Sequence, residues 1–249
     1  MHIHILSVGW VVLLVAAGPA ATGADAIRRR LEAAIGESTR SIERSPRNAA
    51  AYQRRGEDHF RLGHFKESVA DFDKVIELEP DREPYHWQRG ISLYYAGEFE
   101  RGARQFEKHK TVNPDDVENA AWHYLCVARV SGVEKAREVL IPVTGDPRVP
   151  MAQVQALFAG KATPDDVLAA ANAGNPAEAE RRGRLFYAHL YIGLHHEAAG
   201  NADAARRHIL LAAEKYAGDD YMGDVARAHA GLLQAGATPA PPKSESPKG

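Results

Sequence analysis

Two consecutive 34-residue segments decide the fold: residues 49–82, AAAYQRRGEDHFRLGHFKESVADFDKVIELEPDR, and residues 83–116, EPYHWQRGISLYYAGEFERGARQFEKHKTVNPDD. Aligned without a gap, they share glycine, phenylalanine and proline, the residue types that interrupt or anchor secondary structure. The repeated positions are Arg55/Arg89, Gly56/Gly90, Gly63/Gly97, Phe65/Phe99, Phe72/Phe106, Lys74/Lys108, Pro80/Pro114 and Asp81/Asp115. A repeat of this length holds two helices, so the sequence predicts stacked helical hairpins.

The repeated residues each have a structural reason. Gly56 and Gly90 lack a Cβ, so the two helices of a hairpin can cross closely at these positions. Gly63 and Gly97 follow the first helix, where a left-handed conformation is cheap only for glycine. The paired phenylalanines lie seven residues apart on one face of the second helix, and the two prolines are expected to end that helix and to begin the next. Each segment therefore predicts one complete hairpin.

This pattern resembles the tetratricopeptide repeat (TPR) family. The residues that carry the resemblance are Tyr52-x2-Arg55-Gly56-x2-His59, then Gly63-His64-Phe65-Lys66-Glu67-Ser68, and finally Phe72 and Pro80. The resemblance implies an all-α, TPR-type solenoid of helix hairpins wound as a right-handed superhelix. It also implies a non-catalytic, protein-binding role.

The repeats extend on both sides into an array over residues 25–141. Residues 25–46 are expected to form a half-repeat that caps the N-terminal end, as solenoids require. Residues 117–141 form a degenerate unit, because a shift of 35 residues aligns Gly97 with Gly132. The array is therefore expected to hold two regular units and one degenerate unit behind a capping helix.

The second half of the chain departs from this regularity. Residues 142–175 begin with closely spaced prolines, which exclude one continuous helix and predict an irregular linker with short helices. Residues 176–235 are expected to hold a C-terminal TPR-like unit and a capping helix, since Gly193 and Gly200 repeat the spacing of Gly56 and Gly63. The tail, residues 236–249, is rich in proline and is expected to be disordered.

Several helices of this half can be placed from their ends. Thr163-Pro164 predicts a capping residue and a first-turn proline before an acidic turn. Asn175-Pro176 predicts the same kind of start for a longer helix. A short helix is expected over residues 151–158 and a final one over residues 219–234.

The N-terminus predicts export. Residues 1–24 contain no Asp, Glu, Lys or Arg, and residues 8–17 form an apolar run before small residues that permit cleavage after Ala24, or earlier after Ala20 or Ala21. We expect a signal peptide and a periplasmic or secreted protein. The alternative is an uncleaved N-terminus that anchors the chain in the inner membrane, which is then its only membrane contact.

Within the TPR superfamily, the order of elements resembles the periplasmic NlpI-type proteins of Gram-negative bacteria. The late unit contributes the pattern Phe186-Tyr187-x3-Tyr191-x-Gly193. The resemblance implies an adaptor that docks peptidoglycan hydrolases and a processing protease. NlpI-type proteins carry a lipid on an N-terminal cysteine, whereas the single cysteine of this sequence is Cys126. That departure removes the expected lipid anchor.

In TPR arrays the first helix of each unit lines the concave face, and the resemblance carries those positions onto this chain. They predict a peptide-binding groove formed by Gln53, Glu57, Phe60, Arg61, Trp87, Ile91, Tyr94, Tyr95, Trp122 and Arg129. Aromatic and arginine side chains of this kind dominate binding hot spots. The alternative is that Trp87 and Trp122 fill space between adjacent helices.

Other classes of function find little support. The net charge is −2 and no basic run interleaves with aromatics, so nucleic-acid binding is not expected. The sequence lacks the nucleophile-elbow, phosphate-loop and dinucleotide-loop motifs, so no catalytic residue and no cofactor is predicted. His195-His196-Glu197 lacks the second histidine of a zinc helix. With His189 and His208, these histidines are expected mostly on solvated faces, and no metal is predicted.

The sequence therefore favours a non-catalytic scaffold that binds segments of other proteins in a TPR groove and recruits cell-envelope enzymes. A homodimer is one assembly that such a scaffold could form. The alternative is a structural TPR protein that self-associates and binds no peptide ligand.

Overall fold

The computed structural model describes residues 23–237, and all regular structure within them is helical. The elements are α1 (Gly23–Arg44), α2 (Ala49–Arg61), α3 (Phe65–Leu78), η1 (Pro80–Tyr85), α4 (Trp87–Tyr95), α5 (Phe99–Lys110), α6 (Val117–Glu138), α7 (Met151–Phe158), α8 (Pro164–Asn172), α9 (Glu178–Ala198), α10 (Ala202–Leu210), η2 (Leu211–Tyr216) and α11 (Tyr221–Gln234). Residues 1–22 of the predicted signal peptide and residues 238–249 of the predicted tail lie outside the described residues.

Two hairpins, α2/α3 and α4/α5, repeat the same close contact. A Cβ built on Gly56 of α2 would lie 2.7 Å from the ring of Phe72 in α3. A Cβ built on Gly90 of α4 would lie 2.6 Å from the ring of Phe106 in α5. Both phenylalanine rings are buried. The predicted close crossing of the helices at these glycines is confirmed.

The turns of the two hairpins also match. Gly63 and Gly97 adopt φ values of 76° and 80°, in the left-handed region that favours glycine. Phe65 and Phe99 then begin α3 and α5, and each is 8% exposed. Gly132, with φ 86°, breaks α6 at the position that the 35-residue shift aligns with Gly97. The recurrence of the turn explains why a weak third unit is visible in the sequence.

The two prolines of the repeat do not act alike, and the prediction for Pro114 is wrong. Pro80 follows the C-cap of α3 directly and begins η1, as expected. Pro114 neither ends α5 nor begins a helix: α5 stops at Lys110, and Pro114 lies exposed in the turn before α6. The backbone N–H groups of Val112 and Asn113 already close this turn by donating to the carbonyl of His109. A proline restricts chiefly the residue before it. Pro114 therefore restricts Asn113, which already lies beyond the end of α5 at Lys110.

The C-terminal half contains one more pair of this kind, α9/α10. A Cβ on Gly193 of α9 would lie 2.8 Å from the side chain of Ile209 in α10, as at the phenylalanine contacts of the first two hairpins. Gly200, between the two helices, has φ 79°. The glycine spacing thus marks a real helix crossing, in which isoleucine replaces phenylalanine.

The start of α9 differs from the prediction. The helix begins at Glu178 and not at Asn175-Pro176. Gly174 and Asn175 adopt φ values of 78° and 49°, so the chain turns through two left-handed residues after α8. Asparagine tolerates this conformation better than most residues, and Pro176 therefore belongs to the turn. The predicted helix at Met151–Phe158 is confirmed.

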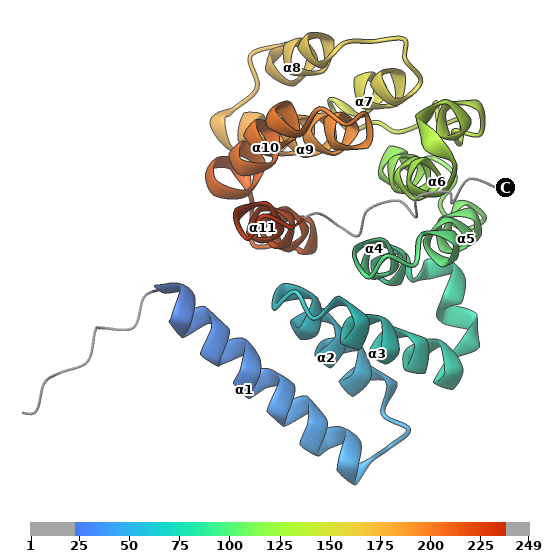
Figure 1. Ribbon diagram of the computed structural model, residues 1–249, viewed down its shortest axis with the longest axis vertical. Helices are drawn as coiled ribbons and strands as arrows, with labels where there is room; N and C mark the ends of the chain where they lie inside the picture. Colours follow the sequence, from blue (N-terminus) through green and yellow to red (C-terminus); the bar gives the residue numbers. More distant parts are fainter. Residues whose placement is uncertain (1–22, 238–249) are drawn as a thin grey trace, which may run out of the picture.

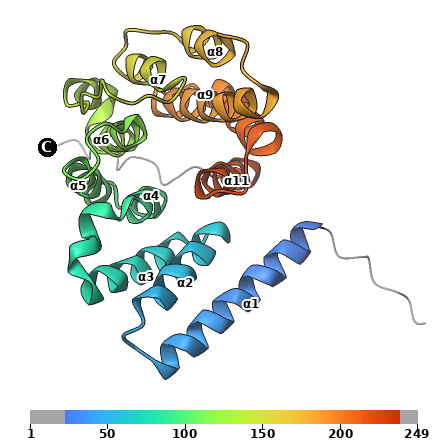
Figure 2. The ribbon, with the colours of Figure 1, turned by 180° about the vertical axis from the view of Figure 1, so that it is seen from behind.

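The chain curls back on itself, so that α11 lies beside α2 and α4 (Figures 1 and 2). The ring of Tyr221 stacks on Phe60 of α2, with 5.3 Å between centroids, and meets Trp87 of α4 edge-on at 5.2 Å. Arg61 Nε donates to Asp224 Oδ2 at 2.7 Å. The last helix therefore packs into the concave side of the first units.

A buried polar cluster supports this closure. Arg129 of α6 donates to Glu197 Oε1 of α9 at 2.6 Å, and Glu197 Oε2 lies 2.9 Å from His229 Nε2 of α11. The other ring nitrogen of His229 lies 2.9 Å from the hydroxyl oxygen of Tyr95 in α4. The cluster joins four helices, and the hydrophobic core runs continuously around it from α2 to α11.

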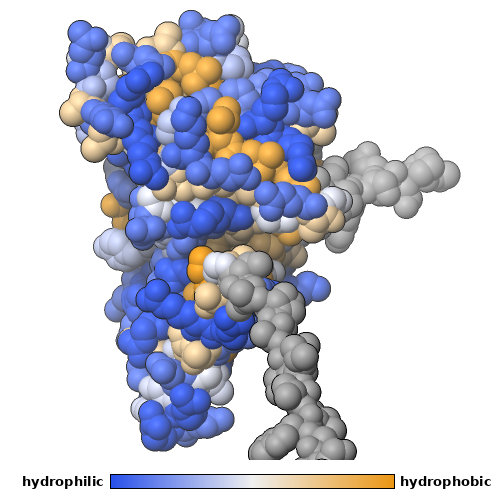
Figure 3. Space-filling view, turned by 90° about the vertical axis from the view of Figure 1, so that its left-hand side faces the viewer, coloured by the Kyte–Doolittle hydropathy of each residue, from blue (hydrophilic) through white to orange (hydrophobic). Residues whose placement is uncertain are grey.

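The surface carries scattered apolar groups. The face in Figure 3 is mostly hydrophilic, with hydrophobic areas in its upper half. Among the described residues, the exposed large hydrophobic side chains are Ile27, Tyr85, Val130, Val139, Val149 and Leu211. None of the described helices combines the length and the apolar character that a membrane span requires.

Candidate functional site

A cavity of about 380 Å³ lies where the concave side of α4–α6 meets α9 and α11. Its lining residues are Trp87, Ile91, Phe106, His109, Asn113, Asp116, Glu118, Asn119, Trp122, Arg148, Tyr187, Asp220, Tyr221 and Met222. The volume falls in the range of pockets that hold small ligands, and it suits one long side chain better than an extended peptide.

Three of the predicted groove residues, Trp87, Ile91 and Trp122, line this cavity. Trp87 is partly exposed, whereas Ile91 and Trp122 are each 1% exposed. Trp122 also packs edge-on against Tyr94, with 5.4 Å between ring centroids. Trp122 is therefore both a core residue and part of the cavity wall.

Three other predicted groove residues, Phe60, Tyr94 and Tyr95, do not line an open groove, contrary to the expectation. Each is at most 4% exposed. Tyr221 and His229 of α11 pack against Phe60 and Tyr95, and further rings of the array enclose Tyr94. The aromatic face that the sequence identifies is real, but the C-terminal helices of the same chain cover most of it.

The four polar residues of the predicted groove bind neighbouring side chains. Gln53 Nε2 donates to Glu57 Oε1 at 2.8 Å and to Gln88 Oε1 of the next unit at 2.9 Å. Arg61 and Arg129 form ion pairs with the C-terminal helices. The two arginines thus hold the array closed, while Gln53 and Glu57 remain partly exposed between units.

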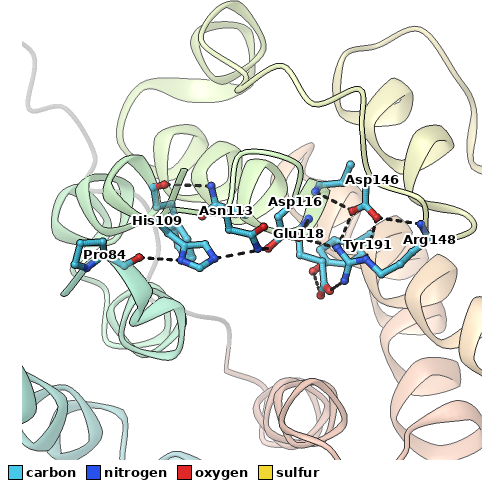
Figure 4. A network of polar contacts seen from close by, with 11 residues as sticks. Pro84, His109, Asn113, Asp116, Glu118, Asp146, Arg148 and Tyr191 are labelled. Carbon is cyan, nitrogen blue, oxygen red and sulfur yellow. Dashed lines mark hydrogen bonds and ion pairs between the residues drawn. The ribbon is translucent and has the colours of Figure 1, made fainter. Parts of the chain in front are cut away.

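The polar wall of the cavity is organised around Arg148, in the segment before α7 (Figure 4). Its guanidinium donates to Asp146 Oδ2 and Asp116 Oδ1, each at 2.7 Å, and to Glu118 Oε1. Asp146 also accepts from the backbone N–H of Val117, and Asp116 from that of Glu118. One guanidinium therefore holds three carboxylates at the N-terminus of α6, where the helix dipole favours negative charge.

Two further side chains extend this network (Figure 4). The hydroxyl of Tyr191 in α9 donates to Glu118 Oε2 at 2.7 Å. The ring of His109 lies between two oxygens, with Nδ1 2.9 Å from the carbonyl of Pro84 and Nε2 3.8 Å from Asp116 Oδ2. Burial lowers the pKa of His109, but Asp116 and the carbonyl outweigh burial and raise it above its usual value.

The carboxylates of the network differ in their pKa values. Burial raises the pKa of Glu118 to about 7, because Arg148 and Tyr191 offset the loss of solvent only in part. Burial also acts on Asp116, but the nearby His109 ring and the guanidinium of Arg148 outweigh it and hold the pKa of Asp116 below the usual value. The bonds of Asp146 to Arg148 likewise outweigh burial and lower its pKa. Of these three carboxylates, only Glu118 changes its charge near neutral pH.

The raised pKa of Glu118 predicts a pH-dependent stability difference between the wild type and Glu118→Gln. Between pH 4.5 and about 7 the carboxyl ionises in the unfolded chain and stays protonated in the folded one. Its contribution to folding therefore falls as pH rises through this window, by up to about 3 kcal/mol, and is level above it. Urea unfolding of both proteins at several pH values measures the difference.

The matched control for this prediction is Glu100→Gln, at an exposed position of α5. Subtracting the free energy of unfolding of each variant from that of the wild type cancels the titration of all other groups. A wild-type-minus-Glu118→Gln difference that rises with pH, or an equal slope for Glu100→Gln, contradicts the assignment.

The sequence does not indicate most of this network. It does not single out Glu118 or Arg148, and it names Tyr191 only as part of the pattern of the late unit. Arg148 and Glu118 are 30 residues apart, and Tyr191 is 73 residues from Glu118. Contacts between residues so far apart in the chain produce no periodic pattern in the sequence from which they could be predicted. The acidic residues at the start of α6 are the only local signal.

Three lining residues carry buried polar atoms without a hydrogen-bond partner. Asn119, 4% exposed, donates through Nδ2 to the carbonyl of Phe106 at 3.1 Å, and its Oδ1 has no partner. The indole Nε1 of Trp122 and the hydroxyl of Tyr221 also have none. Unmade hydrogen bonds of buried groups cost free energy, so the residues beside this cavity carry a local cost in stability.

The remaining reactive side chains do not form a second site. His189 is buried, contrary to the expected solvated position, and its Nδ1 lies 2.9 Å from Nδ1 of His208. His195 and His196 are half-buried. Within the described residues, no group of three His, Cys, Asp or Glu side chains is arranged to bind a metal. Cys126 is fully buried, and burial raises the pKa of its thiol far above the usual range.

Sequence comparison supports the class of protein that the repeated hairpins define. The family model described as Tetratricopeptide repeat matches residues 49–82. The geometry of these residues recurs in residues 83–116, so the chain contains tetratricopeptide-repeat hairpins, and its described part is an all-helical solenoid. Proteins of this class are protein-interaction scaffolds, which use the concave surface that stacked repeats create.

Two known proteins are similar to this chain. A protein of Oryza sativa subsp. japonica described as a Protein SGT1 homolog is 48% identical over 42 residues, which is 17% of this chain and 11% of that protein. The crystal structure of PilW, described as a widely conserved type IV pilus biogenesis factor, is 17% identical, with a TM-score of 0.41. That similarity covers 82% of this chain and 91% of the PilW chain.

Proposed function

We propose that the protein is a non-catalytic scaffold that binds a segment of another polypeptide and anchors one of its side chains in the cavity beside Trp87. The observation that carries this proposal is the cavity itself. It retains three of the predicted groove residues, while the chain's own helices cover the rest of the aromatic face.

The cavity has room for one anchoring side chain, and it does not extend into a groove for a whole peptide. A partly exposed Trp87 at the rim supplies contact area with little loss of conformational freedom, and the buried wall excludes water from whatever enters. Binding energy at protein interfaces is concentrated in a few such pockets. The partly exposed side chain of Glu57 can position the backbone of the bound segment outside the cavity.

The finer features of the proposal rest on the sequence. The proposal of export to the periplasm or beyond the cell rests on the composition of residues 1–24. The proposal that the protein recruits a cell-envelope enzyme rests on the resemblance of its element order to NlpI-type proteins. The alternative is a protein that self-associates and has no peptide ligand. This alternative predicts that isolated peptides do not bind.

Selection of displayed random peptides against the purified protein tests the proposal. Peptides enriched on the wild type should bind Trp87→Ala about 30-fold more weakly, because a hot-spot residue contributes about 2 kcal/mol. Tyr85→Ala is the matched control, since Tyr85 is an aromatic residue two positions away, 64% exposed and outside the cavity. Fluorescence polarisation with labelled peptides gives the affinities.

Circular dichroism of Trp87→Ala shows whether the variant keeps its fold. Peptides that bind Trp87→Ala as tightly as the wild type, or that respond equally to Tyr85→Ala, place the binding surface elsewhere and exclude the cavity as the anchor.

A further inference from the structure

The charged groups of the cavity are mostly acidic. Asp116, Glu118 and Asp220 line it, and Arg148 is the one lining residue that carries a permanent positive charge. His109 also lines it and adds at most one positive charge, which depends on pH. The cavity therefore presents more carboxylates than cations to anything that enters.

Arg148 is not free to bind an anion. It already donates to Asp116, Glu118 and Asp146, and the side chain of Asp146 is 2% exposed. Counting these three carboxylates and Asp220 against Arg148 leaves an excess of negative charge. The excess persists when Glu118 is protonated and His109 is charged. An anionic group such as a C-terminal carboxylate would meet net repulsion here.

Aromatic rings form much of the remaining wall. Trp87 and Trp122 come from α4 and α6, and Tyr187 and Tyr221 come from α9 and α11. The faces of tryptophan and tyrosine attract cations, most strongly in positions shielded from water. A wall that combines carboxylates with aromatic rings is complementary to a guanidinium or an ammonium group.

We infer that the cavity receives the guanidinium or ammonium group of an Arg or Lys side chain carried by the bound polypeptide, an inference that rests on the proposed scaffold function. Asp220, whose Oδ1 alone caps α11, accepts the hydrogen bonds of the cation, and the rings pack against its stem and charge. The preference is opposite to that of TPR domains that grip a C-terminal carboxylate.

The test uses two capped amino acids as probes, N-acetyl-arginine methylamide and N-acetyl-citrulline methylamide. They have the same shape, and only the arginine derivative is charged. The indole N–H signals of Trp87 and Trp122 in NMR spectra report occupancy, once Trp87→Phe and Trp10→Phe have assigned the signals of the three tryptophans. We expect saturable shifts with the arginine derivative and about tenfold weaker binding of the citrulline derivative.

Asp220→Asn provides the charge variant in the protein. Asp220 caps α11 by accepting from Gly223 N at 2.7 Å, and asparagine caps helices equally well, so the fold is retained. Affinity for the arginine derivative should fall several-fold. Asp219→Asn is the matched control, because this neighbouring carboxylate does not line the cavity. It should leave the affinity unchanged.

Equal binding of the two probes, the absence of saturable shifts, or equal losses in Asp219→Asn and Asp220→Asn would overturn the inference. A second arm separates it from the proposed function. Selected peptides that require Trp87 but tolerate Arg or Lys replacement by Gln reject the cationic anchor and keep the scaffold. Peptides that never require Trp87 place the binding surface elsewhere and reject the anchoring cavity of the proposed function.

Discussion

Replacing Arg129 by methionine is expected to lower the free energy of unfolding by about 3–5 kcal/mol, the usual cost of removing one partner from a buried ion pair. The side chains of Arg129 and Glu197 are 11% and 8% exposed, and their atoms lie 2.6 Å apart. Methionine fills a similar volume but leaves the Glu197 carboxylate in the core with His229 as its remaining partner. Urea denaturation followed by circular dichroism gives the change.

Two comparisons sharpen this experiment. Arg28→Met removes an ion pair in α1 whose side chains are 60% and 50% exposed, and it should cost less than about 1 kcal/mol. The double variant Arg129→Met, Glu197→Gln should be more stable than Arg129→Met alone, because the unbalanced buried charge is gone. If Arg28→Met and Arg129→Met cost the same, the buried cluster does not support the closure.

Replacing Gly90 by valine should destabilise the protein by about 3 kcal/mol or more. The new Cβ would lie 2.6 Å from the ring of Phe106, which is 1% exposed and cannot move aside. Overpacking a dense core costs about 1–3 kcal/mol, and more where no side chain can yield. The branched side chain adds two methyl groups to the same contact. The shift in the urea midpoint, at constant slope, measures it.

Gly183→Val is the matched control for this substitution. Gly183 also lies within a helix, α9, but no atom lies within 4 Å of a Cβ built there. Valine is slightly better than glycine in a helix, so the change should be neutral or stabilising by about 0.5 kcal/mol. Similar losses in both variants would show that backbone conformation, and not the contact with Phe106, explains the glycine at position 90.

The repeat geometry can be predicted from the sequence because its causes are local. A glycine, a left-handed turn and a phenylalanine on the next helix recur in each hairpin. Each of them acts only on residues of the same hairpin. Gly56, Gly63, Phe65 and Phe72 therefore lie where the 34-residue period places them. The same rule locates Gly193 against Ile209 in the C-terminal unit.

Pro114 shows where the repeat stops being a reliable guide. It occupies the same place in its segment as Pro80, yet α5 ends four residues before it and the two turns that follow differ. The glycines and phenylalanines are held by contacts between helices, which recur in each hairpin. A proline in a connecting turn has no such contact to preserve its role, so its effect depends on where the preceding helix has already ended.

The candidate site could be predicted only in part, because its other half comes from distant segments. Trp87 and Trp122 follow from the repeat, but Arg148 comes from an irregular segment, and Tyr221 from the last helix. Arg61 and Asp224 are 163 residues apart in the chain. The helical period predicts which face of the array is apolar. It does not predict whether a partner or the chain's own C-terminal helices cover that face.

The contact of α11 with α2 changes the mechanics of the molecule. An open solenoid contacts only its neighbours along the chain, so its ends can fray one unit at a time and the coil can flex like a spring. Here α2, in the first hairpin, is joined to α11, the last described helix, through Arg61 and Asp224. Neither α2 nor α11 can separate from the array without breaking contacts with the other, and these contacts restrain the curvature of the array.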